Sequence, residues 1–301
     1  MEAIAPAKIN LFLHVTGVRD DGYHTLNSIV TFTTDGDDIT ITQGREQEDT
    51  LEITGEFSAL CPKDADNIIF KAISLMRTSF DKQQEPAVHV ALTKNLPIAS
   101  GIGGGSSDGA TVMNMLNEFW EINAPFETLA EIGLSLGADM PMCLYGKRCF
   151  VSGIGEDITP VGVEGNAYDI VLMNALRSVS TPSVFKAYDR LKDAPTTSAP
   201  MAGKKKYVSY YNHTSSEPRE QSSDRKDEEI SNHLTAAAIS LCPVIQDLLD
   251  VTEQADGVKL SSMSGSGGTV FAVMPSSASA EALALAARKK GWWAMQTSLR
   301  V

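Results

Sequence analysis

A glycine-rich segment that leads into a helical pattern constrains this chain more than any other feature. Five of the nine residues from Gly101 to Gly109 are glycine. The apolar residues that follow recur at helical spacing: Ala110, Met113, Leu116 and Trp120. Glycines let backbone N–H groups approach a ligand closely, and a helix N-terminus adds unpaired donors and the positive end of the helix dipole. The segment predicts a phosphate-binding loop, although a flexible connector without a ligand is also compatible with it.

This loop differs from two common nucleotide-binding motifs. A Walker A loop ends in Gly-Lys-Ser/Thr, whereas this one continues Gly105-Ser106-Ser107-Asp108. The dinucleotide fingerprint Gly-x-Gly-x-x-Gly begins at Gly101 and Gly103, but its third glycine position is Ser106. The hydroxyls of Ser106 and Ser107 can cap the helix, bond phosphate oxygens or face a magnesium ion.

The composition excludes several classes of partner. The chain has 25 Lys and Arg against 38 Asp and Glu, a net charge of −13. This balance disfavours nucleic acid and anionic membranes as partners, but a local cationic pocket can still bind a phosphorylated small molecule. The N-terminus does not resemble a signal peptide, and no apolar run is long enough for a membrane span. We therefore expect a cytoplasmic protein with a small-molecule substrate and no nucleic-acid or membrane partner.

Strand-like and helix-like segments mix without strict alternation, which predicts an α+β fold. The predicted strands are 9–15, 29–34, 38–42, 51–54, 88–92, 149–152, 168–173, 270–273 and 292–299. The predicted helices are 67–78, a helix directly after Gly109, 126–136, 183–191, one around residues 248–249, and 278–290.

We expect two domains, residues 1–160 and residues 161–301. Within the second, residues 193–231 are rich in Pro, Ser, Thr and charge, which predicts a mobile insertion. A second glycine-rich stretch, Ser264 to Gly268, leads into a predicted strand. We expect it to support the shape of a site rather than to bind phosphate directly.

Five elements, taken in order, resemble those of one superfamily of small-metabolite kinases, which contains the galactokinases, homoserine kinases, mevalonate kinases and phosphomevalonate kinases. They are Pro6-Ala7-Lys8-Ile9-Asn10-Leu11, Gly22-Tyr23-His24, the glycine loop, Gly137-Ala138-Asp139-Met140-Pro141 and Ser264-Gly265-Ser266-Gly267-Gly268. The first, second and fourth resemble the family that phosphorylates a cytidine diphosphate-linked methylerythritol in the non-mevalonate isoprenoid pathway. The resemblance covers nearly the whole chain outside the insertion. One departure is Asp108, where some relatives carry Asn.

The resemblance implies a two-domain kinase fold with its active site in the cleft between the domains. The N-terminal part would be a ribosomal-protein-S5-like ATP domain, and the C-terminal part a ferredoxin-like α/β sandwich. ATP would be the phosphoryl donor, with Mg²⁺, and the acceptor would be the tertiary 2-hydroxyl of the methylerythritol.

The resemblance also implies a catalytic pair. Asp139 would accept the hydroxyl proton, and Lys8 would lie beside it to orient the hydroxyl or stabilise the transferring phosphoryl group. From the residues alone, Asp139 could equally cap a helix, and Lys8 could lie on the solvent face of its strand.

The remaining site residues follow from the same resemblance. Nucleotide contacts are expected from Asn67, Lys94, Pro97, Ile98, Ala99, Ser100, Gly101, Ile102, Gly103, Gly104, Gly105, Ser106 and Ser107. Acceptor contacts are expected from Asn10, Tyr23, His24, Thr181 and Phe185, with Tyr23 and Phe185 stacking on the base and His24 bonding its polar edge. The magnesium shell would come from ATP oxygens, water and Ser107.

Two alternatives stay open. Another kinase of the superfamily, of the homoserine or mevalonate type, has no base to stack and would leave Gly22-Tyr23-His24 unexplained. A non-catalytic metabolite sensor would be expected to lack Asp139 or Lys8, and both are present. We expect a monomer or a weak homodimer.

Overall fold

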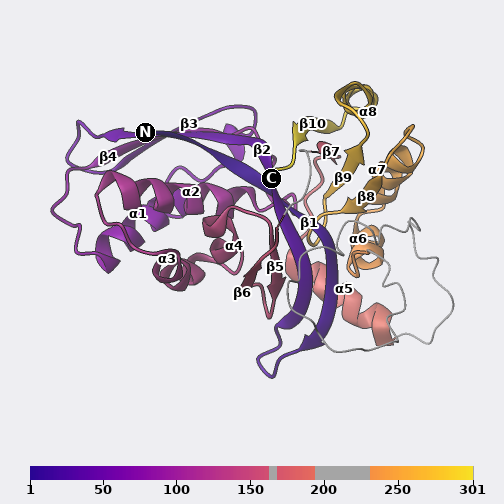
Figure 1. The fold of residues 1–301 in the computed structure, drawn as a ribbon, viewed down its shortest axis with the longest axis horizontal. Coiled ribbons are helices and arrows are strands. Elements are labelled where there is room, and N and C mark those ends of the chain that lie inside the picture. The colour runs from indigo at the N-terminus through magenta and orange to yellow at the C-terminus, as the bar shows by residue number, and fades with distance from the viewer. Residues whose placement is uncertain (163–167, 194–230, 301) are drawn as a thin grey trace.

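Two β-sheets and the helices that cover them make up the chain, as a computed structural model shows (Figure 1). The structure describes residues 1–162, 168–193 and 231–300. The first sheet contains β1 (Glu2–Val18), β2 (His24–Gln43), β3 (Thr50–Thr54), β4 (Val88–Thr93), β5 (Cys149–Ser152) and β6 (Asp157–Pro160). Its order is β3-β4-β2-β5-β6, and β1 pairs antiparallel with β2. The helices of this half are α1 (Ile68–Ser79), α2 (Gly104–Phe119), α3 (Phe126–Gly133) and α4 (Met140–Tyr145).

The second sheet is antiparallel, in the order β10-β7-β9-β8. Its strands are β7 (Asp169–Asn174), β8 (Leu260–Met263), β9 (Thr269–Met274) and β10 (Trp293–Ser298). The helices of this half are α5 (Thr181–Asp193), α6 (Thr235–Leu241), α7 (Val244–Glu253) and α8 (Ser277–Lys289). In chain order these strands are first, second, third and fourth, so the spatial order is 4-1-3-2, which is that of a ferredoxin-like sandwich. The predicted α+β kinase fold is confirmed.

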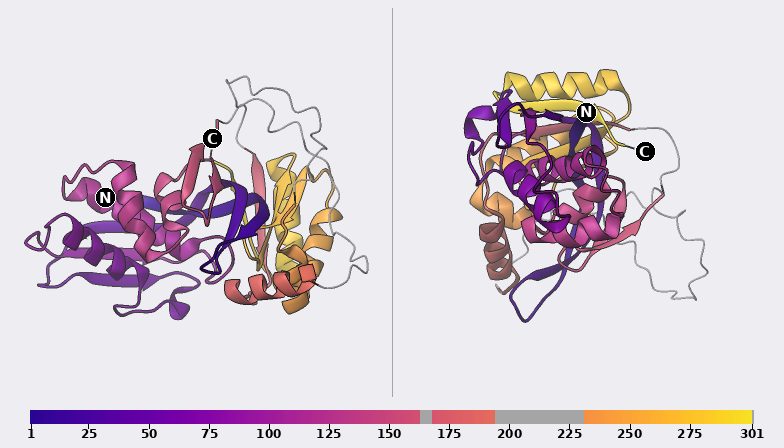
Figure 2. Two further views of the ribbon diagram at one scale, coloured as in Figure 1. Left: turned by 90° about the horizontal axis from the view of Figure 1, so that it is seen from below. Right: turned by 90° about the vertical axis from the view of Figure 1, so that its left-hand side faces the viewer.

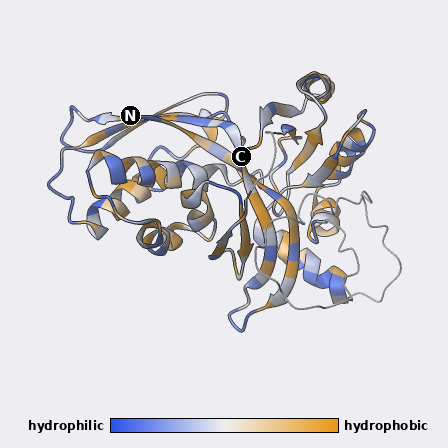
Figure 3. Cartoon of the chain, in the orientation of Figure 1, coloured by the Kyte–Doolittle hydropathy of each residue, from blue (hydrophilic) through white to orange (hydrophobic). Residues whose placement is uncertain are grey.

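The two-residue period of a strand explains how the halves pack. On β7, Val171 and Met173 pack into the core beneath α5–α8, whereas Ile170 and Leu172 pack with Ile9 of β1 in a core shared by the two halves. Figure 2 shows the second sheet beside the long β1–β2 ribbon, and Leu299, just after β10, pairs with Thr33 in the middle of β2. In Figure 3, apolar and polar segments alternate along that ribbon. On β7, this alternation gives each of the two cores one face of the strand.

The structure corrects several predicted boundaries. Residues 29–34 and 38–42 belong to one continuous strand, β2, because Gly36 and its acidic neighbours pair with β1 instead of turning. Gly36 lies opposite Pro6, and a Cβ at Gly36 would lie 1.9 Å from the carbonyl oxygen of Ala5. The helix predicted after Gly109 begins inside the loop, at Gly104. The short elements α4, α6, β6 and β8 were not predicted, because each has too few residues to establish a period.

Two other expectations concern the organisation of the chain. Apart from its end residues 193 and 231, the predicted insertion lies outside the described residues. The division into domains at residue 160 stays a prediction, although the two sheets are built from residues 2–160 and 169–298. No helix in the described ranges combines the length and the apolar character that a bilayer crossing needs.

Candidate active site

Both halves of the molecule line one cavity of about 1160 Å³. It receives side chains from β1, from the start of α2, from the turn before α4 and from α5. The predicted site residues that line it are Lys8, Asn10, Tyr23, His24, Asn67, Lys94, Pro97, Ile98, Ala99, Ser100, Gly101, Gly103, Gly104, Gly105, Ser106, Asp139, Thr181 and Phe185. Ile102 and Ser107 are buried and do not line it.

The structure brings Lys8 and Asp139 together in this cavity. Lys8 Nζ lies 3.1 Å from Asp139 Oδ2, with side-chain exposures of 7% and 38%. Asp139 occupies the N-cap position of α4, but its side chain makes no capping hydrogen bond. Lys8 is 5% exposed and does not lie on a solvent-facing side of β1. Both alternatives to a catalytic pair therefore disagree with the geometry, and the pair presents a carboxylate and an ammonium to the cavity.

The glycine loop holds backbone donors next to this pair. Gly103 is the N-cap of α2 in the left-handed region, with φ of 63°. A Cβ there would lie 3.2 Å from Lys8 Cβ and 3.6 Å from Asp139 Oδ2. The Ser107 N–H donates to the Gly103 carbonyl oxygen, so the three N–H groups before Ser107, those of residues 104–106, precede the first bond of the helix. These donors and the helix dipole make an anion-binding site that lines the cavity.

The second glycine-rich stretch buttresses the first. The Ser264 hydroxyl is buried and lies 3.3 Å from the carbonyl oxygen of Gly101, and the Asn10 N–H donates to it at 3.2 Å. A Cβ at Gly101 would lie 2.4 Å from the carbonyl oxygen of Gly267, so the two loops touch backbone to backbone. These contacts agree with the supporting role expected of this stretch, since it fixes the loop and β1 against each other.

Two predicted nucleotide contacts, Asn67 and Lys94, have other partners in the structure, and a third, Ser107, is buried. Ser107 is 1% exposed, and the N-cap position of α2 belongs to Gly103 and not to either serine of the pair. Asn67 caps α1: its Oδ1 accepts from the Ile69 N–H and its Nδ2 donates to the Pro62 carbonyl oxygen. In the described part of the chain, no three His, Cys, Asp or Glu side chains gather to hold a metal ion. Of the two serines, Ser106 is the one that reaches the cavity.

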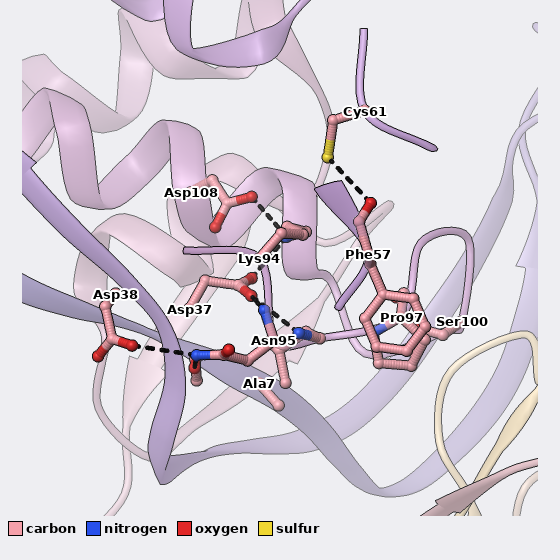
Figure 4. Close-up of polar contacts among 12 residues, drawn as sticks. Ala7, Asp37, Asp38, Phe57, Cys61, Lys94, Asn95, Pro97, Ser100 and Asp108 are labelled. Carbon is pink, nitrogen blue, oxygen red and sulfur yellow. Dashed lines mark hydrogen bonds and ion pairs between the residues drawn. The ribbon is translucent and has the colours of Figure 1, made fainter. Parts of the chain in front are cut away.

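Lys94 belongs to a buried cluster that the sequence did not reveal (Figure 4). Its ammonium bonds Asp37 and Asp108, and all three side chains are at most 4% exposed. Asp37 Oδ1 accepts the backbone N–H groups of Asn95 and Leu96, so it also fixes the chain that enters the glycine loop. We call Asp37, Lys94 and Asp108 the buried triad.

The charges of the buried triad are strongly shifted by their surroundings. Burial raises the pKa of Asp108 to about 8; the Lys94 charge opposes this rise and the Asp37 charge adds to it. Burial alone would lower the pKa of Lys94, but the two carboxylates together raise it above its usual value. Asp108 Oδ1 has no hydrogen-bond partner among the described residues. One cation thus faces two acids, and Asp108 ionises less easily than an ordinary aspartate.

The predicted base-binding residues gather at the other end of the cavity. The His24 and Phe185 rings stack with centroids 4.6 Å apart and planes at 25°. His24 Nε2 lies 2.8 Å from Asp189 Oδ1. Tyr23 is 60% exposed, and the Thr181 hydroxyl bonds the Ser266 hydroxyl at 2.7 Å. Phe185 thus lies against His24, and α5 is tied to the second glycine-rich stretch.

Asn10 lies two residues after Lys8 on β1 and lines the same cavity. Its Nδ2 donates to the Ser28 hydroxyl at 2.8 Å. Its Oδ1 is buried without a hydrogen-bond partner among the described residues. An unpaired buried acceptor is costly, and a substrate hydroxyl would satisfy it.

Three acidic residues that bond predicted site residues were not identified from the sequence, for a common reason. In the sequence, Asp37 stands between two predicted strands, and Asp108 takes a position where some relatives carry Asn. Asp189 lies inside the predicted helix 183–191. Each lies 14 to 165 residues along the chain from the side chain that it bonds, outside any local motif. A lysine in an apolar context, such as Lys94 after β4, is the signal that could have prompted a search for buried acids.

Comparisons with known proteins agree with this geometry. Residues 67–147 match the family described as GHMP kinases N terminal domain, and residues 221–291 match GHMP kinases C terminal. The chain is 40% identical over 299 residues to the 4-diphosphocytidyl-2-C-methyl-D-erythritol kinase of Brucella abortus biovar 1 (strain 9-941), covering 97% of this chain and 93% of the relative. It is 37% identical over 303 residues to the kinase of the same name from Chelativorans sp. (strain BNC1), covering 100% and 96%.

One solved structure gives the same assignment, and a second shares the fold. A crystal structure of 4-(cytidine 5'-diphospho)-2C-methyl-D-erythritol kinase superposes with a TM-score of 0.77 at 26% identity, covering all of both chains. A homoserine kinase from Cytophaga hutchinsonii ATCC 33406 shares the fold, with a TM-score of 0.65 at 17% identity over 100% of this chain and 94% of that one. The chain therefore belongs to the 4-diphosphocytidyl-2-C-methyl-D-erythritol kinase family of the GHMP kinases.

Proposed function

We propose that the chain transfers the γ-phosphoryl group of ATP to the 2-hydroxyl of 4-diphosphocytidyl-2-C-methyl-D-erythritol, giving the 2-phosphate and ADP. The observation that carries the proposal is the Lys8–Asp139 pair, which faces the cavity beside the helix N-terminus of the glycine loop. Phosphoryl transfer needs an anion cradle, a cation and a proton acceptor at one point. The N–H groups that follow Gly103 contribute the anion cradle, Lys8 contributes the cation, and Asp139 contributes the proton acceptor.

In this proposal, separate groups of the chain bind the phosphates, accept the proton and stabilise the developing charge. The N–H groups at the start of α2 hold the phosphates of ATP. Asp139 accepts the proton of the acceptor hydroxyl, and Lys8 orients Asp139 and stabilises the charge that develops on the transferring group. Mg²⁺, bound mainly through ATP oxygens and water, would neutralise phosphate charge, and Ser106 is the serine of the pair available to it.

The acceptor would extend from Asn10 to the aromatic end of the cavity. The unpaired Asn10 Oδ1 suits a methylerythritol hydroxyl. His24, Phe185 and the exposed ring of Tyr23 suit a planar base. Homoserine and mevalonate have no such group, so this end of the cavity favours the nucleotide-linked acceptor over theirs.

The test is an acceptor panel with the purified chain. We expect ADP release, with ATP and Mg²⁺, when 4-diphosphocytidyl-2-C-methyl-D-erythritol is added and at most background release with homoserine or mevalonate. A phosphorus NMR spectrum of the product should show a new phosphomonoester beside the intact diphosphate. Turnover of mevalonate or homoserine without turnover of the cytidyl compound would contradict the proposal. A monomeric or weakly dimeric state and a cytoplasmic location stay predictions.

A further inference from the structure

The imidazole of His24, the first residue of β2, is held by one helix. Phe185 and Asp189 are four residues apart on α5, so they lie on the same face of it one turn apart. Phe185 stacks on the plane of the His24 ring, and Asp189 bonds its Nε2 at 2.8 Å. The ring of Tyr188 approaches His24 edge-on, with centroids 6.3 Å apart. One face of α5 thus fixes both the tilt and the in-plane rotation of the ring.

The His24–Asp189 contact contributes little as a stabilising ion pair. The Asp189 side chain is 46% exposed, whereas that of His24 is 10% exposed. Pairs with such an exposed partner are screened by water and add little to folding stability. The contact does, however, hold the buried imidazole of His24 in one orientation. His24 and Asp189 line the same cavity as Asp139.

A carboxylate bonded to Nε2 requires a hydrogen on that nitrogen, since the carboxylate only accepts. In the neutral ring Nδ1 then carries the lone pair. Nδ1 of His24 has no hydrogen-bond partner among the described residues. An acceptor at that position pairs with an amino group but not with a carbonyl oxygen. Cytosine carries an exocyclic amino group where uracil carries a carbonyl oxygen.

We propose that Asp189 is a positioning residue for substrate selection: it fixes His24 with its hydrogen on Nε2, so that Nδ1 accepts from the amino group of a cytosine base. This inference rests on the proposed function, because it assumes a cytidine diphosphate-linked acceptor in the cavity. It adds to that function a basis for rejecting the uridine analogue, which would place its own acceptor against the Nδ1 lone pair.

The kinetic test uses Asp189→Asn and Asp189→Ala with the cytidine-linked acceptor and its uridine-linked analogue. An Asn amide can accept from Nε2–H or donate to a bare Nε2, so it no longer selects the tautomer. We expect the KM for the cytidine-linked acceptor to rise about tenfold, which corresponds to one hydrogen bond. The cytidine-over-uridine preference in kcat/KM should fall by a similar factor, while kcat and the KM for ATP stay within about twofold. Asp247→Asn, at an exposed α7 position outside the cavity lining, is the matched control and should change nothing.

A second readout follows the ring itself. Nitrogen-15 NMR of the histidine-labelled protein near pH 8, with His24→Gln for assignment, should show hydrogen on Nε2 of His24 in the unmodified chain and a mixture of tautomers in Asp189→Asn. Hydrogen on Nδ1 in the unmodified chain, or an unchanged nucleoside preference in both variants, would overturn the inference. If the unmodified chain does not turn over the cytidine-linked acceptor at all, the proposed function fails, and the inference fails with it.

Discussion

Two lysine–aspartate clusters flank the glycine loop, and they differ in exposure. In the cavity, Lys8 faces one acid, Asp139, whose side chain is 38% exposed. In the buried triad, Lys94 faces two acids that are at most 4% exposed. The first pair can exchange a proton with a bound hydroxyl, because one of its carboxylate oxygens is within reach of the cavity. Lys94 and Asp108 also line the cavity, but their charged groups bond each other within the triad, and Asp37 fixes the chain that enters the loop. Under the proposed function, the same residue types transfer a proton in one place and hold the backbone in the other.

The largest effect should come from removing the cation of the buried triad. Lys94→Met removes the cation that two buried acids share, which costs about 3–5 kcal/mol of unfolding free energy. The matched substitution Lys8→Met leaves a half-exposed Asp139 that water can solvate, so its cost should stay near about 1 kcal/mol. Urea unfolding of both variants measures the difference, and equal losses would contradict the comparison.

Lys8→Met should cost little stability but much activity. Lys8→Met removes the charge beside Asp139, and we expect kcat to fall by about a hundredfold while ATP still binds. Steady-state kinetics and calorimetric titration with ATP separate the two quantities. A variant that loses nucleotide binding but keeps kcat would place Lys8 with the phosphates and not with the proton acceptor.

The raised pKa of Asp108 predicts a pH dependence of stability. Between about pH 4 and pH 8 the folded chain holds a proton that the unfolded chain has released, so stability falls as pH rises and levels above the folded-state pKa of about 8. The slope is at most about 1.4 kcal/mol per pH unit. Relative to Asp108→Asn, the native chain should therefore lose stability from about pH 6 to pH 8. Parallel stability curves for the two proteins would show that Asp108 titrates normally.

The smallest effect concerns two glycines of the loop. Gly103→Ala places a Cβ in a left-handed residue and 3.2 Å from Lys8 Cβ, which should cost about 1–2 kcal/mol and reduce kcat. A Cβ at Gly105 meets nothing within 4 Å, so Gly105→Ala should leave stability unchanged or slightly raised. Thermal unfolding of the pair tests this, and equal losses would indicate that the loop tolerates neither.

Motifs that combine neighbouring residues were predictable from the sequence. The glycine loop, the Lys8 strand and the Asp139 turn are each local, and a resemblance in their order was enough to place them in one site. The 4-1-3-2 sheet was implied by that resemblance and not by the period of its strands, since β8 is too short to show one. The buried triad and the His24–Asp189 pair were not predictable, because their members are 14 to 165 residues apart and only tertiary packing brings them together.

The claim that Asp139 accepts the proton, whereas Asp108 is structural, is tested most directly by single-turnover kinetics. The assay follows phosphoryl transfer from ATP to 4-diphosphocytidyl-2-C-methyl-D-erythritol by the variants Asp139→Asn and Asp108→Asn. Asparagine keeps the shape of each side chain but cannot take up a proton. We predict that Asp139→Asn slows transfer by at least about a hundredfold with ATP affinity unchanged. Asp108→Asn should stay within a few-fold of the native rate. Near-native transfer by Asp139→Asn would contradict this claim, as would an equal loss in Asp108→Asn.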